Sequence, residues 1–94
     1  MDLRERVDKY IKMEDEAISK IKISVPEISY FGTMAKDFMD MIKNYYNDAL
    51  YFYKKNDLVN AFAALNYSYG WIDAGIRLGI FDGGPDYKMF TQYK

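Results

Sequence analysis

The chain has 94 residues and a formal net charge of −1, with 13 basic and 14 acidic side chains and neither cysteine nor histidine. This length predicts one domain with a modest core, and 50% hydrophobic and 29% charged residues are ordinary for a folded domain. The lack of cysteine excludes disulfides and thiol chemistry, and the lack of histidine removes the commonest general base and transition-metal ligand. The balanced charge argues against nucleic-acid binding, which normally requires a positive excess.

The sequence gives no sign of export or of membrane insertion. The first ten residues carry charges of both signs and no apolar run, so we expect no secretory signal. The longest uncharged run, residues 58–72, contains Asn60, Asn66 and Ser68 and is shorter than the roughly 18 apolar residues of a membrane span. We therefore expect a cytoplasmic protein without membrane association.

Residues 3–22 are predicted to form the first helix. Apolar side chains recur there at spacings of three and four, which places them on one face of an α-helix: Leu3, Val7, Tyr10, Ile11, Ala17, Ile18 and Ile21. No glycine or proline interrupts the stretch. Glu14 lies in the middle of this apolar face, where a carboxylate is unusual.

A second helix is predicted over residues 26–55. Ser24 can cap its first turn, Glu27 can bond back to Ser24, and Pro26 is tolerated because its missing N–H has no helical partner. This early start places Ile28 and Phe31 on the same apolar face as Phe38 and Ile42. A start near Thr33, after a loop, is the alternative.

The next predicted elements are a tight turn, a third helix over residues 58–81 and a tail over residues 82–94. In the turn, Asn56 suits a left-handed backbone and Asp57 is a strong helix cap, so the second and third helices form an antiparallel hairpin. Only Asp73 and Arg77 are charged between residues 58 and 81. The Asp82-Gly83-Gly84-Pro85 run must end the helix. The tail has four large apolar residues, which we expect to dock on the third helix or on another chain: Tyr87, Met89, Phe90 and Tyr93.

Together these elements predict an all-α fold, a three-helix up-and-down bundle that forms a single domain over residues 1–94. Part of the chain resembles a short archaeal family known only as domain of unknown function 357. The resemblance rests on residues 36–81, and above all on Tyr45-Tyr46-Asn47-Asp48-Ala49 and Gly70-Trp71-Ile72-Asp73-Ala74. It implies a three-helix bundle with a left-handed twist and an archaeal source. Since the family has no established activity, no catalytic residue can be transferred.

The third helix has a second apolar sector beyond its core face. Its members are Ala63, Tyr67, Trp71, Ala74, Leu78 and Phe81. Tyrosine and tryptophan are the types most enriched at interface hot spots, so Tyr67, Trp71, Ala74 and Leu78 are the candidate interaction surface. Three coverings are possible: the tail of the same chain, a second copy in a homodimer, or an unidentified protein partner. We expect a non-catalytic protein-interaction or assembly module.

A possible buried polar site is the alternative. Glu14, Asp73 and Arg77 could converge in a crevice between helices and form a small-ligand or weakly enzymatic site. The simpler interpretation is that Glu14 is bonded to a tyrosine hydroxyl, a lysine or Arg77. We assign no catalytic residue, metal or cofactor, and the pattern as a whole favours a protein that is not an enzyme.

Overall fold

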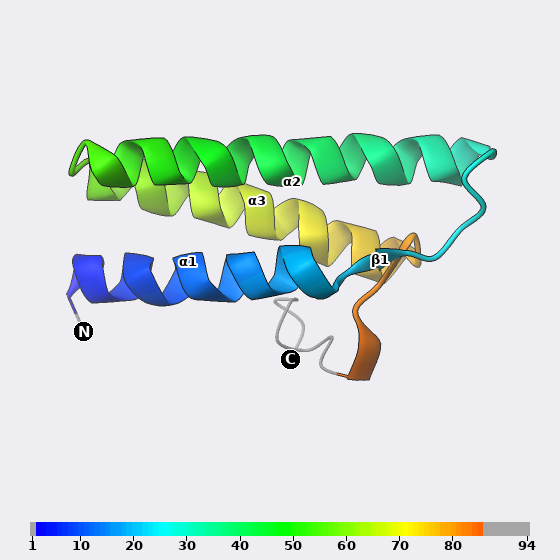
Figure 1. Cartoon of the computed structure of the whole chain (residues 1–94), viewed down its shortest axis with the longest axis horizontal. Helices are drawn as coiled ribbons and strands as arrows, with labels where there is room; N and C mark the ends of the chain where they lie inside the picture. Colours follow the sequence, from blue (N-terminus) through cyan, green and yellow to red (C-terminus); the bar gives the residue numbers. More distant parts are fainter. Residues whose placement is uncertain (1, 86–94) are drawn as a thin grey trace.

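A computed structural model describes residues 2–85 of the chain. Three helices follow one another, α1 (Leu3–Lys20), α2 (Tyr30–Lys54) and α3 (Leu58–Leu78), and they run alternately in opposite directions (Figure 1). Two short strands, β1 (Lys22–Ile23) and β2 (Phe81–Asp82), pair antiparallel near the end of α1. The predicted all-α fold with three helices is confirmed. The small sheet was not predicted.

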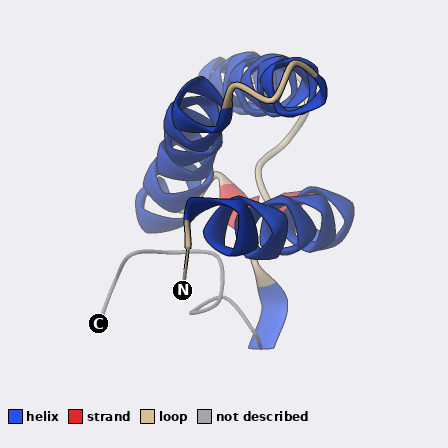
Figure 2. Cartoon of the chain, turned by 90° about the vertical axis from the view of Figure 1, so that its left-hand side faces the viewer, coloured by secondary structure: helices blue, strands red, loops and turns tan. Residues whose placement is uncertain are grey.

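Helix α3 occupies the centre of the arrangement. It makes its most extensive contacts with α2 and further contacts with α1, whereas α1 and α2 contact each other least. In the end-on view of Figure 2, α2 and α1 accordingly lie on different sides of α3. A helix that is apolar nearly all round suits this position, because two neighbours bury it.

The core consists of two clusters along the bundle. The first includes Ala17, Ala35, Ile42, Ile72, Ile80 and Phe81, and the second includes Val7, Ala49, Ala61, Ala64 and Leu65. Several of these residues are alanines, which allow close approach of the helices. The core therefore combines short interhelical distances with a few large aliphatic side chains.

Helix α1 ends at Lys20, two residues before the predicted end at residue 22. The reason is the strand pairing, in which Lys22 lies opposite Asp82 and Ile23 opposite Phe81. Ser24 continues this contact, since its N–H donates to the Ile80 carbonyl (3.0 Å) and its hydroxyl donates to the Gly79 carbonyl (2.7 Å). Ser24 therefore joins the end of α1 to the end of α3, and it does not cap a helix.

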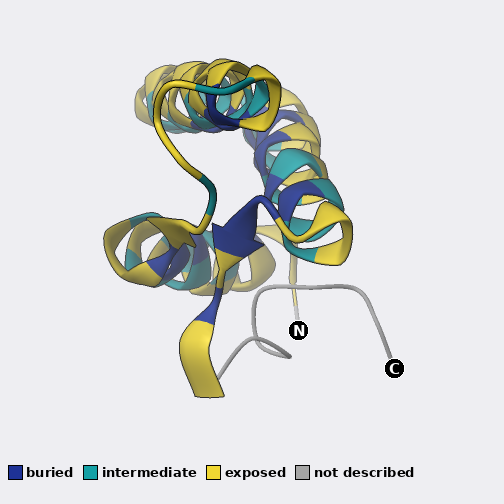
Figure 3. Ribbon diagram, turned by 90° about the vertical axis from the view of Figure 1, so that its right-hand side faces the viewer, coloured by how far each residue is buried: buried dark blue, intermediate teal, exposed yellow. Residues whose placement is uncertain are grey.

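The predicted start of the second helix near Pro26 is wrong, and so is the alternative at Thr33. Helix α2 begins at Tyr30, and its cap is Ser29, whose hydroxyl oxygen accepts from the Gly32 N–H at 2.9 Å. Residues 24–28 follow β1 as an extended segment on the outside of the bundle, and most of them are exposed (Figure 3). Ile28 is consequently 98% exposed and does not join the buried face.

The turn between α2 and α3 agrees with its prediction. Asn56 has a φ of 60°, and the Asp57 side chain accepts from the Asn60 N–H at 3.2 Å. The predicted end of the third helix at residue 81 is wrong, because α3 ends at Leu78. Gly79 (φ 78°) turns the chain, and the Ile80 N–H donates back to the Gly75 carbonyl at 3.1 Å, as in a Schellman motif.

The predicted tail over residues 82–94 begins with a strand residue, Asp82 of β2. Phe81, assigned above to the third helix and to its second apolar sector, lies in β2 and is 3% exposed. Its side chain is part of the core. Tyr87, Met89, Phe90 and Tyr93 lie outside the described residues.

Two glycines of α3 are expected to respond oppositely to replacement by alanine. A Cβ at Gly75 would clash with the Phe81 ring, whereas within residues 2–85 a Cβ at Gly70 meets nothing within 4 Å outside its own helix. In the single chain, Gly70→Ala should raise the free energy of unfolding by about 1 kcal/mol through helix propensity. Gly75→Ala should lower it by about 1–3 kcal/mol because the buried ring must move. Urea denaturation measures both changes, and a destabilising Gly70→Ala would show that this position is packed.

Candidate functional site

The candidate interaction surface lies where α2 and α3 meet. We call it the outer α2–α3 face and define it by Tyr45, Tyr67, Trp71, Ala74 and Leu78. Tyr45 and Tyr67 stack, with ring centroids 5.2 Å apart and an angle of 19° between the rings. Trp71 packs edge-on against Phe38 of α2, with ring centroids 4.8 Å apart. The stacked and edge-on pairs fix the orientation of these rings across the two helices.

The face is open to solvent at several of its large side chains. Tyr67 is 63% exposed and Leu78 is 57% exposed, while Trp71 and Ala74 are half-buried. A shallow depression of about 350 Å³ lies along α3 and is lined by Asn66, Tyr67, Gly70, Trp71 and Ala74. Of the four residues predicted from the sequence, Tyr67, Trp71 and Ala74 line this depression, and Leu78 is exposed further along α3.

Glu14 lies inside the bundle, as its position on the apolar face predicted. It is 1% exposed, and its Oε2 is hydrogen-bonded to the hydroxyl of Ser68 on α3. The same hydroxyl oxygen lies 2.8 Å from the Ile42 carbonyl of α2. Among residues 2–85, Glu14 Oε1 finds no hydrogen-bond partner. The structure thus gives this buried carboxyl group a serine of α3 as its hydrogen-bond partner.

Burial changes the acidity of Glu14. Loss of hydration raises the pKa of Glu14 to about 7, although the hydrogen bond with Ser68 acts in the opposite direction. Two nearby phenols are affected as well. Burial, together with the charge of Glu14, raises the pKa of Tyr69 to about 12, and burial and the charges of Asp15 and Glu14 raise the pKa of Tyr46. The surroundings of Glu14 therefore favour its protonated form.

Asp73 and Arg77 form a separate pair near the end of α3. The Arg77 Nε donates to Asp73 Oδ1 at 2.7 Å, and the two side chains are 49% and 14% exposed, with the arginine the more exposed. Asp73 follows Ser68 by five residues, which turns it about 140° around the helix axis. Hydrogen bonds thus join Glu14 to Ser68 and Asp73 to Arg77.

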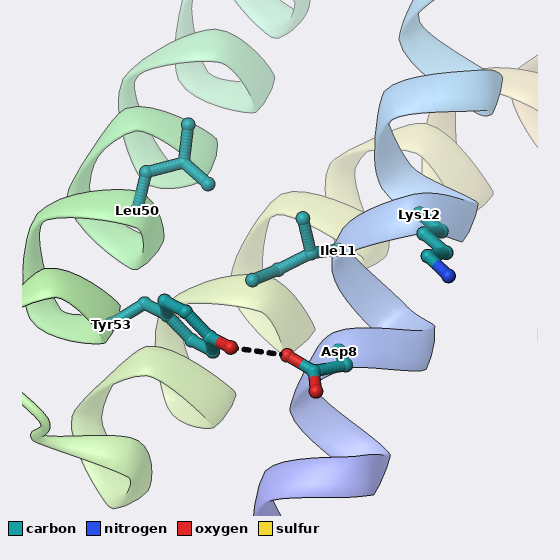
Figure 4. Close-up of a pocket in the computed structure, with 5 residues that line it drawn as sticks. All are labelled: Asp8, Ile11, Lys12, Leu50 and Tyr53. Atoms are coloured by element: carbon teal, nitrogen blue, oxygen red, sulfur yellow. Dashed lines mark hydrogen bonds between the residues drawn. The ribbon is translucent and has the colours of Figure 1, made fainter.

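A groove between α1 and α2 was not anticipated from the sequence. It has a volume of about 390 Å³ and is lined by Asp8, Ile11, Lys12, Leu50 and Tyr53 (Figure 4). The Tyr53 hydroxyl crosses the groove and donates to Asp8 at 2.5 Å. Asp8 and Tyr53 are 45 residues apart, so no local pattern could have paired them.

A second exposed apolar patch lies at the start of α2. Tyr30 and Phe31 pack edge-on with centroids 5.5 Å apart and are 76% and 53% exposed, next to the exposed Ile28. Ile28 and Phe31 were predicted on the buried face, because the helical periodicity was extended too far toward the N-terminus. The Ser29 cap was the local signal that could have revealed the later start.

Neither a metal cluster nor a membrane span is found in the described part of the chain. Within residues 2–85, no three acidic side chains gather in a way that could hold a metal ion. No helix between these residues is long and apolar enough to cross a bilayer.

Known proteins of one family are similar to this chain. The family model described as "Protein of unknown function (DUF357)" matches residues 9–81. The crystal structure of protein AF1782 from Archaeoglobus fulgidus, which carries the same family description, is similar with a TM-score of 0.70 and 26% sequence identity. The similarity covers 85% of this chain and 91% of that one. No curated protein matches the sequence significantly.

The stability of the protein is expected to fall as pH rises. The folded-state pKa of Glu14, about 7, lies above its unfolded value of 4.5, so folding takes up a proton between these values. The stabilisation is complete below pH 4.5 and is lost by the time the pH has passed 7. The loss amounts to about 3 kcal/mol. Urea denaturation across a pH range from about 4.5 to about 8 measures it.

The matched variants are Glu14→Gln and Glu16→Gln. The amide introduced by Glu14→Gln cannot ionise but can donate to Ser68 as a protonated carboxyl group does, so this variant should lose most of the pH dependence. Glu16 forms an exposed ion pair with Lys20, and Glu16→Gln should leave the dependence in place. Identical pH profiles for the wild type and Glu14→Gln would refute the assignment to Glu14.

Proposed function

The chain belongs to the DUF357 family, and we propose that it is a non-catalytic assembly module that binds a second copy of itself through the outer α2–α3 face. The observation that carries the proposal is the exposure of Tyr67, which is stacked on Tyr45 and yet 63% open to solvent. A ring that is already oriented loses little side-chain entropy when a partner covers it. Such rings are frequent among interface hot spots.

The charge of the chain supports a second copy as the occupant. On α3 the face runs from Tyr67 to Leu78, which is about 17 Å at 1.5 Å per residue. The net charge of −1 adds no appreciable repulsion between copies. A symmetric dimer is also the commonest assembly of soluble proteins.

The shape of the face supports close packing. Gly70 and Ala74 are one helical turn apart, and their small size forms the depression beside Tyr67 and Trp71. Within residues 2–85, a Cβ at Gly70 would meet nothing within 4 Å beyond its own stretch of helix, so the described residues do not require a glycine there. A glycine costs an exposed helix about 1 kcal/mol, and a partner that enters the depression would offset this cost.

A small-ligand site at Glu14, Asp73 and Arg77 is the second candidate. In its favour, Glu14 Oε1 is buried without a hydrogen-bond partner and could accept one from a ligand. Against it, Glu14 is bonded to Ser68 whereas Asp73 is bonded to Arg77. Ser68 and Asp73 lie about 140° apart around the axis of α3. The outer α2–α3 face therefore has the stronger support.

Light scattering behind a sizing column tests the assembly proposal. Across a hundredfold concentration range, we expect a mass approaching about 22 kDa, twice the 11.1 kDa of one chain. Tyr67→Ala and Trp71→Ala should return the mass to that of one chain, because they remove the apolar contact. A mass that stays at 11.1 kDa at every concentration would overturn self-assembly through this face.

Tyr51→Ala is the matched control. Tyr51 lies on α2, is 59% exposed and packs edge-on against Phe52, but it does not belong to the outer α2–α3 face. Its replacement removes a similar amount of exposed aromatic surface and should leave the mass unchanged. Equal effects of Tyr51→Ala and Tyr67→Ala would show that the mass depends on general hydrophobicity and not on this face.

A further inference from the structure

The attachment of α1 to the rest of the bundle depends on an unusual residue. Only three side chains of α1 are buried, Val7, Glu14 and Ala17, and the carboxylic acid is the largest of them. Helix α2, by contrast, buries Ile42 together with alanines, and α3 buries Leu65 and Ile72. Because α1 contacts α2 little, its hold on the bundle comes mainly from α3, where Ser68 faces Glu14.

The hydrogen bonds around Ser68 can all be made only when Glu14 is protonated. The serine hydroxyl has one proton, and two oxygens lie within reach of it, Glu14 Oε2 and the Ile42 carbonyl. A protonated Glu14 donates to Ser68, which then donates to Ile42, and one chain of hydrogen bonds links α1, α3 and α2. An ionised Glu14 competes with Ile42 for the single proton, so a buried oxygen is left without a donor.

The surrounding groups do not offset the ionisation of Glu14. Tyr10 and Asp15 of α1, Tyr46 of α2, and Tyr69 and Asp73 of α3 are the titratable groups that act on Glu14 or on the phenols beside it. All of them are acids, which are either neutral or negative near neutral pH. A negative charge on Glu14 therefore meets desolvation and no opposite charge among these groups.

We propose that Glu14, Ser68 and the Ile42 carbonyl form a proton-dependent latch, which fastens α1 to the α2–α3 hairpin when Glu14 is protonated and loosens α1 when it ionises. The hairpin keeps its own contacts in both states, since α2 and α3 share the most extensive interface of the bundle. Opening of α1 uncovers Ala61 and Leu65 of the core cluster that contains Val7. The latch does not involve the outer α2–α3 face.

Hydrogen–deuterium exchange of the full chain, resolved by peptide, tests the latch. Exchange at about pH 5 and about pH 8 is corrected for the intrinsic pH dependence of amide exchange, and protection of α1 is compared with that of α2 and α3. Between these pH values, the population of the open form of α1 should rise on the order of 50-fold in the wild type. In Glu14→Gln it should change little, while Glu16→Gln should behave as the wild type does.

Ser68→Ala provides a second variant in case Glu14→Gln does not fold. Ser68→Ala removes the hydroxyl that joins Glu14 to the Ile42 carbonyl, so protection of α1 should already be reduced at about pH 5. A direct NMR titration of the Glu14 carboxyl carbon in the wild type needs no variant, and its midpoint should coincide with the midpoint of α1 loosening.

Three results would overturn the proposal. Equal loss of protection in all three helices would show that Glu14 acts on global stability without releasing α1. The same pH response in the wild type and in Glu14→Gln would exclude Glu14 as the sensor. A Glu14 titration midpoint near the ordinary 4.5 would show that its ionisation is already complete where the latch is supposed to operate.

Discussion

Small residues along α3 allow the close packing on which the other features depend. Ala61, Ala64, Ser68 and Gly75 are all buried on this helix, and they leave room for the neighbouring side chains. At Gly75 the missing side chain admits the Phe81 ring of β2, and at Ser68 the short side chain reaches the Ile42 carbonyl of α2. A larger residue at either position would separate elements that now touch. The close packing of the other elements around α3 is therefore a consequence of its small side chains.

This packing leaves α1 as the helix with the least independent support. Its buried side chains are a valine, an alanine and a glutamic acid, and the acid depends on a single serine for its hydrogen bond. The β1–β2 pair and Ser24 attach the C-terminal end of the helix, and the hydrogen bond from Tyr53 to Asp8 attaches its N-terminal half to α2. A helix whose middle is attached through a titratable group is suited to local opening. The outer α2–α3 face, in contrast, is built on the most extensive interface of the bundle.

Local signals in the sequence were read correctly at some positions and missed at others. The number of helices followed from apolar spacing, and Asn56 and Asp57 correctly marked the turn before α3, whereas the Ser29 cap and the helix end at Gly79 were missed. Distant residues that control the backbone added to the errors. Ser24 has the composition of a helix cap, but its hydrogen bonds go to Gly79 and Ile80, which keeps the chain extended until Ser29. Phe81 continues the apolar pattern of α3, yet Gly79 ends the helix and the phenylalanine enters the core from a strand.

The candidate site, too, could be predicted from the sequence only in part. Periodicity alone was enough to place Tyr67, Trp71, Ala74 and Leu78 on one side of a helix and Glu14 on a buried face, because both statements need only the 3.6-residue repeat. The packed helices were needed to show that Tyr45 stacks on Tyr67, that Ser68 bonds to Glu14, and that Tyr53 meets Asp8. The members of each pair come from different helices. Their meeting depends on how closely two helices approach and on their register, which no local pattern encodes.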